Sequence, residues 1–146
     1  MKKNGRHAMG RFTVEIELAN YDDLVEAERG HLDRSKVRRT TVRGVVDSGA
    51  TRLILPEAVA KELGLQIRKQ KVKVRYADGR RSVRKEVGPV NLRLQGREDV
   101  FSAIVEPKRD TALIGAIVLE DLDFLVDCQS QRLVPRDPDY VVSEIE

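Results

Sequence analysis

The sequence predicts a mostly β domain, a small barrel or closed sandwich of short strands with one main short helix. Two observations favour this fold class. Apolar residues make up 40% of the 146 residues, yet aromatic residues make up only 4% and tryptophan is absent, so Val, Leu and Ile must build the core. Such side chains pack well on the pleated surface of a strand. Short apolar stretches, several with period-two alternation, also recur between turn signals along the chain.

The first half of the chain contains the clearest helix. Residues 11–18 alternate between apolar and polar side chains and predict a half-buried strand. Residues 20–36 are highly charged and predict a surface connection, with a helical turn around 22–28 that stops at Gly30. A second strand at 37–46 leads into a turn, and a short apolar strand follows at 51–55. Pro56 suits the first helical position and Gly64 the stop, so residues 56–63 form the main helix.

The second half contains the clearest hairpin. Residues 71–76 alternate strictly, Asp78-Gly79 provides a turn, and residues 80–87 return. We expect a break at Gly88-Pro89 and further strands at 90–94 and 100–105. Residues 112–115 form a short buried stretch, 116–122 one or two helical turns, and 124–126 with 132–134 a terminal hairpin. After Pro135 the chain is polar, and we expect it to be loose.

The length fits one domain better than two, and we divide the chain into an N-terminal extension (1–10), the domain itself (11–136) and a polar C-terminal tail (137–146). No stretch approaches the ~20 apolar residues of a membrane span. The single Cys128 cannot form an internal disulfide, and it does not form a metal site with the widely spaced His7 and His31. We therefore expect a soluble, cytoplasmic protein that uses no metal or other cofactor and no membrane.

Positive charge is concentrated in one segment. The net charge is only +3 and the signs are mixed, but residues 68–85 hold nine basic residues and one acid, Asp78. Alternation places Lys69, Lys71, Lys73 and Arg75 on one side, which in the simplest interpretation is the solvated face of the hairpin. The alternative is a cationic rim that favours acidic substrates or nucleic acid. The absence of interleaved aromatic residues argues against nucleic acid.

The segment Val45-Val46-Asp47-Ser48-Gly49-Ala50 is the most informative one for function. Two β-branched residues bring an acid to the end of an apolar strand, and Ser and Gly then turn the chain without bulk beside the carboxylate. Asp-Ser-Gly by itself is ordinary turn chemistry. It gains weight because a strand, a helix, the Asp-Gly hairpin, the Leu113-Ile114-Gly115 stretch and a second short helix follow in this order.

This order of motifs resembles that of the retropepsin-like aspartic peptidases, over about residues 11–136. The resemblance implies an acid-protease barrel with an active-site loop at Asp47–Ala50, in which Asp47 is catalytic and Ser48, Gly49 and Ala50 support the loop. It implies that Tyr76, Ala77, Asp78 and Gly79 form a mobile flap that binds an extended polypeptide substrate. It also implies that Leu113, Ile114 and Gly115 pass beside the active-site loop. Thr51-Arg52 follow Ala50 where viral members tend to carry acids, so no substrate preference is carried over.

Aspartic peptidases need two carboxylates, about 3 Å apart, that share one proton. This chain has one Asp-Ser/Thr-Gly, and the other acids considered, Asp78, Asp110 and Asp127, are more simply explained as solvated turn residues. The second carboxylate should then be Asp47 of a twin subunit in a homodimer. We expect an aspartic endopeptidase. The alternatives are a catalytically silent module of the same fold that binds peptides or only dimerises, and, with the least support, a basic nucleic-acid-associated β domain.

Overall fold

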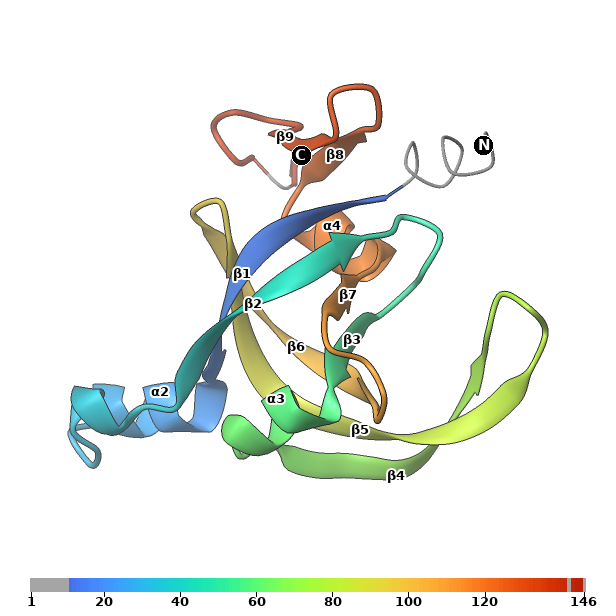
Figure 1. The fold of residues 1–146 in the computed structure, drawn as a ribbon. Coiled ribbons are helices and arrows are strands. Elements are labelled where there is room, and N and C mark those ends of the chain that lie inside the picture. The colour runs from blue at the N-terminus through green and yellow to red at the C-terminus, as the bar shows by residue number, and fades with distance from the viewer. Residues whose placement is uncertain (1–10, 142, 146) are drawn as a thin grey trace.

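The protein is a closed β-barrel with one long hairpin extending from it (Figure 1). In the computed structural model, residues 11–141 and 143–145 are described. The barrel strands, in spatial order, are β1 (Phe12–Asn20), β2 (Arg39–Val46), β7 (Ala112–Ile114), β3 (Leu53–Pro56), β6 (Arg97–Glu106) and β5 (Arg81–Leu94). Pairing of β1 with β5 closes the ring. The predicted mostly β barrel is confirmed.

Two further pieces of sheet lie outside the ring. Strand β4 (Gln66–Arg75) pairs with β5 and occupies the end of the sheet order. Its hairpin with β5 extends away from the barrel and curves upward at its tip (Figure 1). Strands β8 (Phe124–Asp127) and β9 (Arg132–Pro135) form the predicted terminal hairpin as a separate two-stranded sheet.

Short helices cover the ends of the barrel. They are α2 (Tyr21–Glu28), α3 (Glu57–Glu62) and α4 (Ala116–Asp121), with a 3-10 turn at Arg34–Lys36. Pro56 lies one position before α3 as its cap. In α2, where only a turn was expected, the buried Asn20 accepts a hydrogen bond from the Asp23 N–H at 3.0 Å and donates one to the Leu63 carbonyl at 2.9 Å. This cap stabilises a full helix. Among the described residues, no helix is long and apolar enough to cross a membrane.

The barrel interior is filled by aliphatic side chains, as the composition predicted. The period-two alternation of β1 buries Ile16 and Leu18 almost completely. Facing strands and the helices α3 and α4 contribute the rest, and the larger fully buried side chains include Val46, Leu53, Leu55, Leu63, Val90, Leu92, Leu94, Ile114, Val118 and Leu122. Burying one such side chain contributes roughly 1.5–3 kcal/mol, so this core is the main stabilising feature of the barrel.

The expected break at Gly88-Pro89 is wrong. Strand β5 runs through both residues as one 14-residue strand, so the two strands predicted at 80–87 and 90–94 are one. The pairing of β5 with β6 shifts register between Val87 and Val90, which marks a bulge. A bulge accommodates a proline, which cannot donate a ladder hydrogen bond. Gly88 fits because a Cβ there would come within 3.3 Å of the Phe101 carbonyl oxygen.

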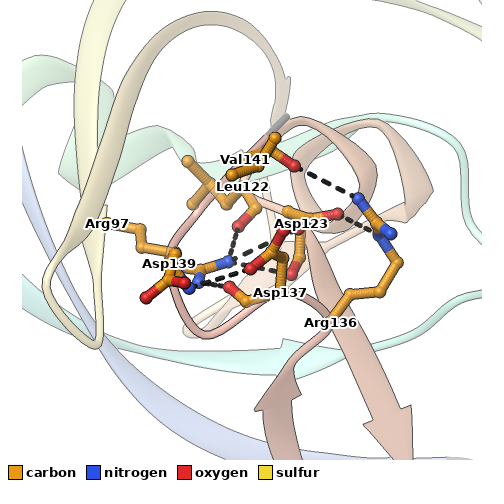
Figure 2. Close-up of polar contacts among 7 residues, drawn as sticks. All are labelled: Arg97, Leu122, Asp123, Arg136, Asp137, Asp139 and Val141. Carbon is orange, nitrogen blue, oxygen red and sulfur yellow. Dashed lines mark hydrogen bonds and ion pairs between the residues drawn. The ribbon is translucent and has the colours of Figure 1, made fainter. Parts of the chain in front are cut away.

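The tail that was expected to be loose is attached to the barrel at its start (Figure 2). The buried Arg97 donates to the carbonyls of Leu122 and Asp123, both at 2.9 Å, and to the carbonyl of Asp137. Its guanidinium also lies 4.2 Å from the ring centroid of Tyr140. Arg136 donates to the Asp123 carboxylate at 2.5 Å. A buried arginine needs many acceptors, and the tail supplies one of them.

Candidate active site

Asp47 follows the last residue of β2, at the point where that strand leaves the barrel. Val46 is fully buried and pairs in parallel with Ile114 of β7. The Asp47 N–H continues this pairing by donating to the Ile114 carbonyl at 3.0 Å. The backbone of Asp47 is therefore fixed by the barrel, while its side chain keeps 16% of its surface exposed.

The turn after Asp47 orients its carboxylate. The Gly49 N–H donates to Asp47 Oδ1 at 3.0 Å, and the Ala50 N–H donates to the Asp47 carbonyl at 3.0 Å. A Cβ on Gly49 would lie 3.2 Å from Asp47 Oδ1, so a side chain there would crowd the carboxylate. Ser48 is exposed. The loop thus holds one carboxylate oxygen by a backbone amide and leaves the region beside it open.

The structure brings the Leu113–Gly115 stretch against this loop. The N–H groups of Ala116 and Ile117 donate to the carbonyls of Ala50 and Thr51, at 2.8 and 2.9 Å. A Cβ on Gly115 would come within 2.5 Å of the Arg52 carbonyl oxygen and 2.8 Å of the Ala50 carbonyl oxygen. Only glycine allows this approach of two backbones. The start of α4 and the Asp47 loop therefore form one rigid unit.

Arg11 is a neighbour of Asp47 that the sequence did not reveal. Its Nη2 lies 3.1 Å from Asp47 Oδ2, and its side chain is 55% exposed. Arg11 directly precedes β1, and the pairing of Phe12 with Val46 places the two segments side by side. The contact depends on strand register across 36 residues of sequence, so no local sequence signal identifies it.

A second arginine connects the Asp47 loop to the base of the hairpin. Arg52 Nη2 donates to the carboxylate of Glu86 on β5 at 2.5 Å and to the hydroxyl of Ser102 on β6 at 2.8 Å. The hydrogen bond from Arg52 lowers the pKa of Glu86, against the opposing effect of burial. This network ties the Asp47 loop, β5 and β6 together.

The hairpin tip is a tight turn at the residues assigned to a flap. The Gly79 N–H donates to the Tyr76 carbonyl at 2.9 Å, and the Tyr76 N–H donates to the Arg80 carbonyl at 2.9 Å. Gly79 has a φ of +89°, a conformation that favours glycine. Asp78 accepts hydrogen bonds from the Arg80 backbone and side chain, which lower its pKa. Ala77 is exposed in this turn.

The hairpin is also fastened to the barrel by a polar contact that the sequence did not predict. The Tyr76 hydroxyl donates to Glu106 Oε2 at the end of β6, at 2.8 Å. Arg84 donates to both groups, to Glu106 Oε1 at 3.0 Å and to the Tyr76 hydroxyl at 2.6 Å. Burial and the carboxylate of Glu106 raise the pKa of Tyr76. We call Tyr76, Arg84 and Glu106 the flap latch.

The structure does not bring another acid to Asp47. Within the described residues, Asp127 caps its own turn by accepting from the N–H groups of Gln129 and Ser130, and Asp110 is exposed. The interactions with Ser130 lower the pKa of Asp127. Within the described residues, the contacts of the Asp47 carboxylate are with the Gly49 amide and Arg11, and no bond joins it to another acid.

The comparisons with known proteins agree with this geometry. The profile of the family described as gag-polyprotein putative aspartyl protease matches residues 34–121. Among solved structures, EIAV protease complexed with the inhibitor HBY-793 is similar, with a TM-score of 0.53 and 18% sequence identity. The similarity covers 77% of this chain and 88% of that chain, and at this identity it is a likeness of fold. No curated protein matches the sequence.

Proposed function

The chain belongs to the gag-polyprotein putative aspartyl protease family, and from that premise we propose that it is an aspartic endopeptidase whose catalytic carboxylate is Asp47. One observation carries the proposal. Asp47 follows a buried strand, its backbone is fixed by the Ile114 carbonyl, and the Gly49 amide holds one oxygen of its carboxylate. A carboxylate in a fixed position, with part of its surface open, suits a general acid–base group.

The chemistry requires a second carboxylate, and we propose that a twin subunit supplies it. Within the described residues, the charged side chain paired with Asp47 is Arg11, a cation. A two-fold axis beside Asp47 and Ser48 would bring two Asp47 side chains together. Two such carboxylates cannot both ionise at this separation, so they share a proton. The ionised one removes a proton from a water molecule, and the protonated one polarises the carbonyl of the scissile peptide bond.

Arg11 must leave Asp47 when the dimer forms, because a guanidinium would keep both carboxylates charged. The geometry supports an inexpensive exchange. The Arg11 side chain is 55% exposed, so water can solvate its guanidinium once it leaves Asp47. In the separate subunit, Arg11 thus neutralises a charge that the dimer uses for catalysis.

In the same proposal, the β4–β5 hairpin is the flap. It extends beyond the barrel (Figure 1), and its turn at Tyr76–Gly79 is joined to the barrel end by the flap latch. A substrate chain in an extended conformation would pair with exposed backbone of the hairpin, as an added strand does. The flap would then hold the peptide over the two carboxylates.

The test is cleavage of an unfolded protein mixture at several pH values by the parent and by Asp47→Asn. The amide can neither activate water nor donate a carboxylic proton, so we expect cleavage to fall by roughly 10²–10⁴-fold. Asp127→Asn is the matched control, because Asp127 also ends an apolar strand but lies in a turn of its own. Sedimentation of both variants should show a dimer, since the substitution at Asp47 removes repulsion between like charges.

Two outcomes would contradict the proposal. Equal cleavage by Asp47→Asn and the parent would remove Asp47 as the catalytic acid. A parent protein that dimerises but cleaves nothing at any pH would instead favour the silent peptide-binding module.

A further inference from the structure

The β4–β5 hairpin has two faces of opposite character. One face is half-buried. It consists of Val72 and Val74 of β4 and their cross-strand partners Arg84 and Ser82 of β5. The other face, which we call the outer flap face, is exposed throughout. It consists of Lys71, Lys73, Arg75, Arg81, Val83 and Lys85.

The cations of this face have no acidic partners. On the inner face Arg84 is paired with Glu106 at 3.0 Å, and at the tip Arg80 is paired with Asp78 at 2.9 Å. Within the part of the chain that the structure describes, the five cations of the outer flap face form no ion pair. The two acids of the hairpin are already engaged, Asp78 by Arg80 and Glu86 by Arg52. Five positive charges therefore remain uncompensated on one strip of sheet.

This arrangement differs from the rest of the molecule. Elsewhere, opposite charges face each other across strands, as in the pairs Glu15 with Arg43, Glu17 with Arg93, Arg93 with Glu98, and Asp127 with Arg132. On the outer flap face Arg75 lies directly opposite Arg81. Like charges at such a position destabilise a sheet. A face needed only for solubility would carry mixed signs, as the other faces do.

The shape of the region suits an extended chain. A hollow of about 710 Å³ is lined by Lys73, Arg75, Arg81 and Val83 of the outer flap face and by Val74 and Ser82 of the opposite face. Val83 is 52% exposed in the middle of the cations, which offers an apolar contact. Strand β4 ends the sheet order, so its outer edge has unpaired backbone groups. A polypeptide can use all three features.

We propose that the outer flap face binds acidic, extended polypeptide segments and so selects acidic substrates for the site at Asp47. The second part rests on the proposed function, whereas binding does not require catalysis. Complementary charge raises the rate of encounter and disfavours basic partners. Nucleic acid is the weaker fit, because the ring of Tyr76, the aromatic residue of the hairpin, is covered by the Arg80 guanidinium, 4.5 Å from its centroid.

The test measures binding in the Asp47→Asn background, where we expect cleavage to be roughly 10²–10⁴-fold slower. The probe is a fluorescein-labelled peptide of about twelve residues in which glutamate alternates with threonine, long enough to span the strands of the hairpin. Its lysine–threonine counterpart and a single-stranded oligonucleotide of equal charge are compared by fluorescence anisotropy. We expect the acidic peptide to bind, binding to weaken as salt is raised from roughly 50 to 200 mM, and the lysine peptide not to bind.

Two triple charge reversals separate a local surface from net charge. The first variant combines Lys73→Glu, Arg75→Glu and Arg81→Glu. It should weaken binding of the acidic peptide about tenfold or more, because each exposed charge contributes modestly to the affinity and the three effects accumulate. The control reverses Arg29, Lys36 and Lys108, which are exposed and lie outside the hairpin. It changes the net charge equally and should leave the affinity within about twofold.

The outcomes also separate this inference from the proposed function. Three results would each overturn the inference, even if the parent protein cleaves peptides. They are an equal loss of affinity in both triple variants, tighter binding of the oligonucleotide than of the acidic peptide, and no binding of the acidic peptide. Binding of the acidic peptide that depends on the hairpin charges would support the outer flap face as a binding surface, even if the protein proved to have no peptidase activity.

Discussion

The barrel and the β4–β5 hairpin share strand β5 but are stabilised by different interactions. From Glu86 onward β5 is mostly buried, with neighbours on both sides, whereas between Arg81 and Lys85 it is exposed or half-buried and pairs with β4. The barrel is held by apolar packing, which is non-directional and cooperative. The hairpin is held by its ladder hydrogen bonds and the flap latch. In the proposed function, the catalytic loop therefore belongs to the stable part, and the moving cover belongs to the part with few buried contacts.

The glycines provide the sharpest way to test this comparison. Gly115→Ala should destabilise the barrel by about 3 kcal/mol, because its Cβ would overlap the Arg52 and Ala50 carbonyl oxygens and neither backbone can retreat. Urea denaturation measures the change. Gly96→Ala is the control, since Gly96 has a φ of +83° but nothing within 4 Å of a Cβ, and should cost about 1 kcal/mol. Similar losses at both positions would show that the two loops are not tightly packed.

The hairpin tip should respond in function more than in stability. Gly79→Val places a β-branched residue at a φ of +89°, which distorts the turn. We expect lower turnover with the barrel intact, as measured by steady-state kinetics and circular dichroism. Gly30→Val introduces the same backbone strain at a φ of +80° beside α2, far from the hairpin in the chain. If both variants keep the parental turnover, the hairpin is not a flap.

Removal of a hydrogen bond of the flap latch should increase the motion of the hairpin alone. Tyr76→Phe removes the hydroxyl that donates to Glu106 and accepts from Arg84, at a cost of about 1 kcal/mol. Hydrogen exchange should accelerate in residues 72–84 and stay unchanged in the barrel strands. Tyr21→Phe, at an exposed tyrosine of α2, should change neither region. Uniform acceleration over the whole chain would mean that the hairpin and the barrel open together.

A further expected effect concerns pH and lies on the barrel side. A hydrogen bond between the carboxyls of Asp99 and Asp121 raises the pKa of Asp121 to about 6 and lowers that of Asp99. The folded protein thus holds a proton on Asp121 that the unfolded chain releases near pH 3.8, so stability should fall as pH rises from about 4 through 6. In Asp121→Asn this decrease should be absent from urea midpoints measured across that range. An unchanged pH profile would exclude the shared proton.

Much of the barrel could be predicted because its signals are local. The alternation of β1, the proline and glycine around α3, and the Asp-Gly turn each specify an element within a few residues. The motif at Asp47 was visible for the same reason, and so was its resemblance to a family. The prediction of a strand break at Gly88-Pro89 was wrong because a bulge depends on pairing with the neighbouring strand β6, which the local sequence does not reveal.

The sequence by itself determined the strand content, the aliphatic core and the single candidate carboxylate, because these follow from periodicity and residue chemistry. Only the tertiary structure decided which side chains contact Asp47 and Tyr76. Arg11 reaches Asp47 through the register of β1 and β2, and Glu106 reaches Tyr76 across 30 residues of chain. It also decided which cations find acidic partners and which remain free on the outer flap face. Pairings between residues distant in sequence depend on the packing of the whole barrel, so no short segment encodes them.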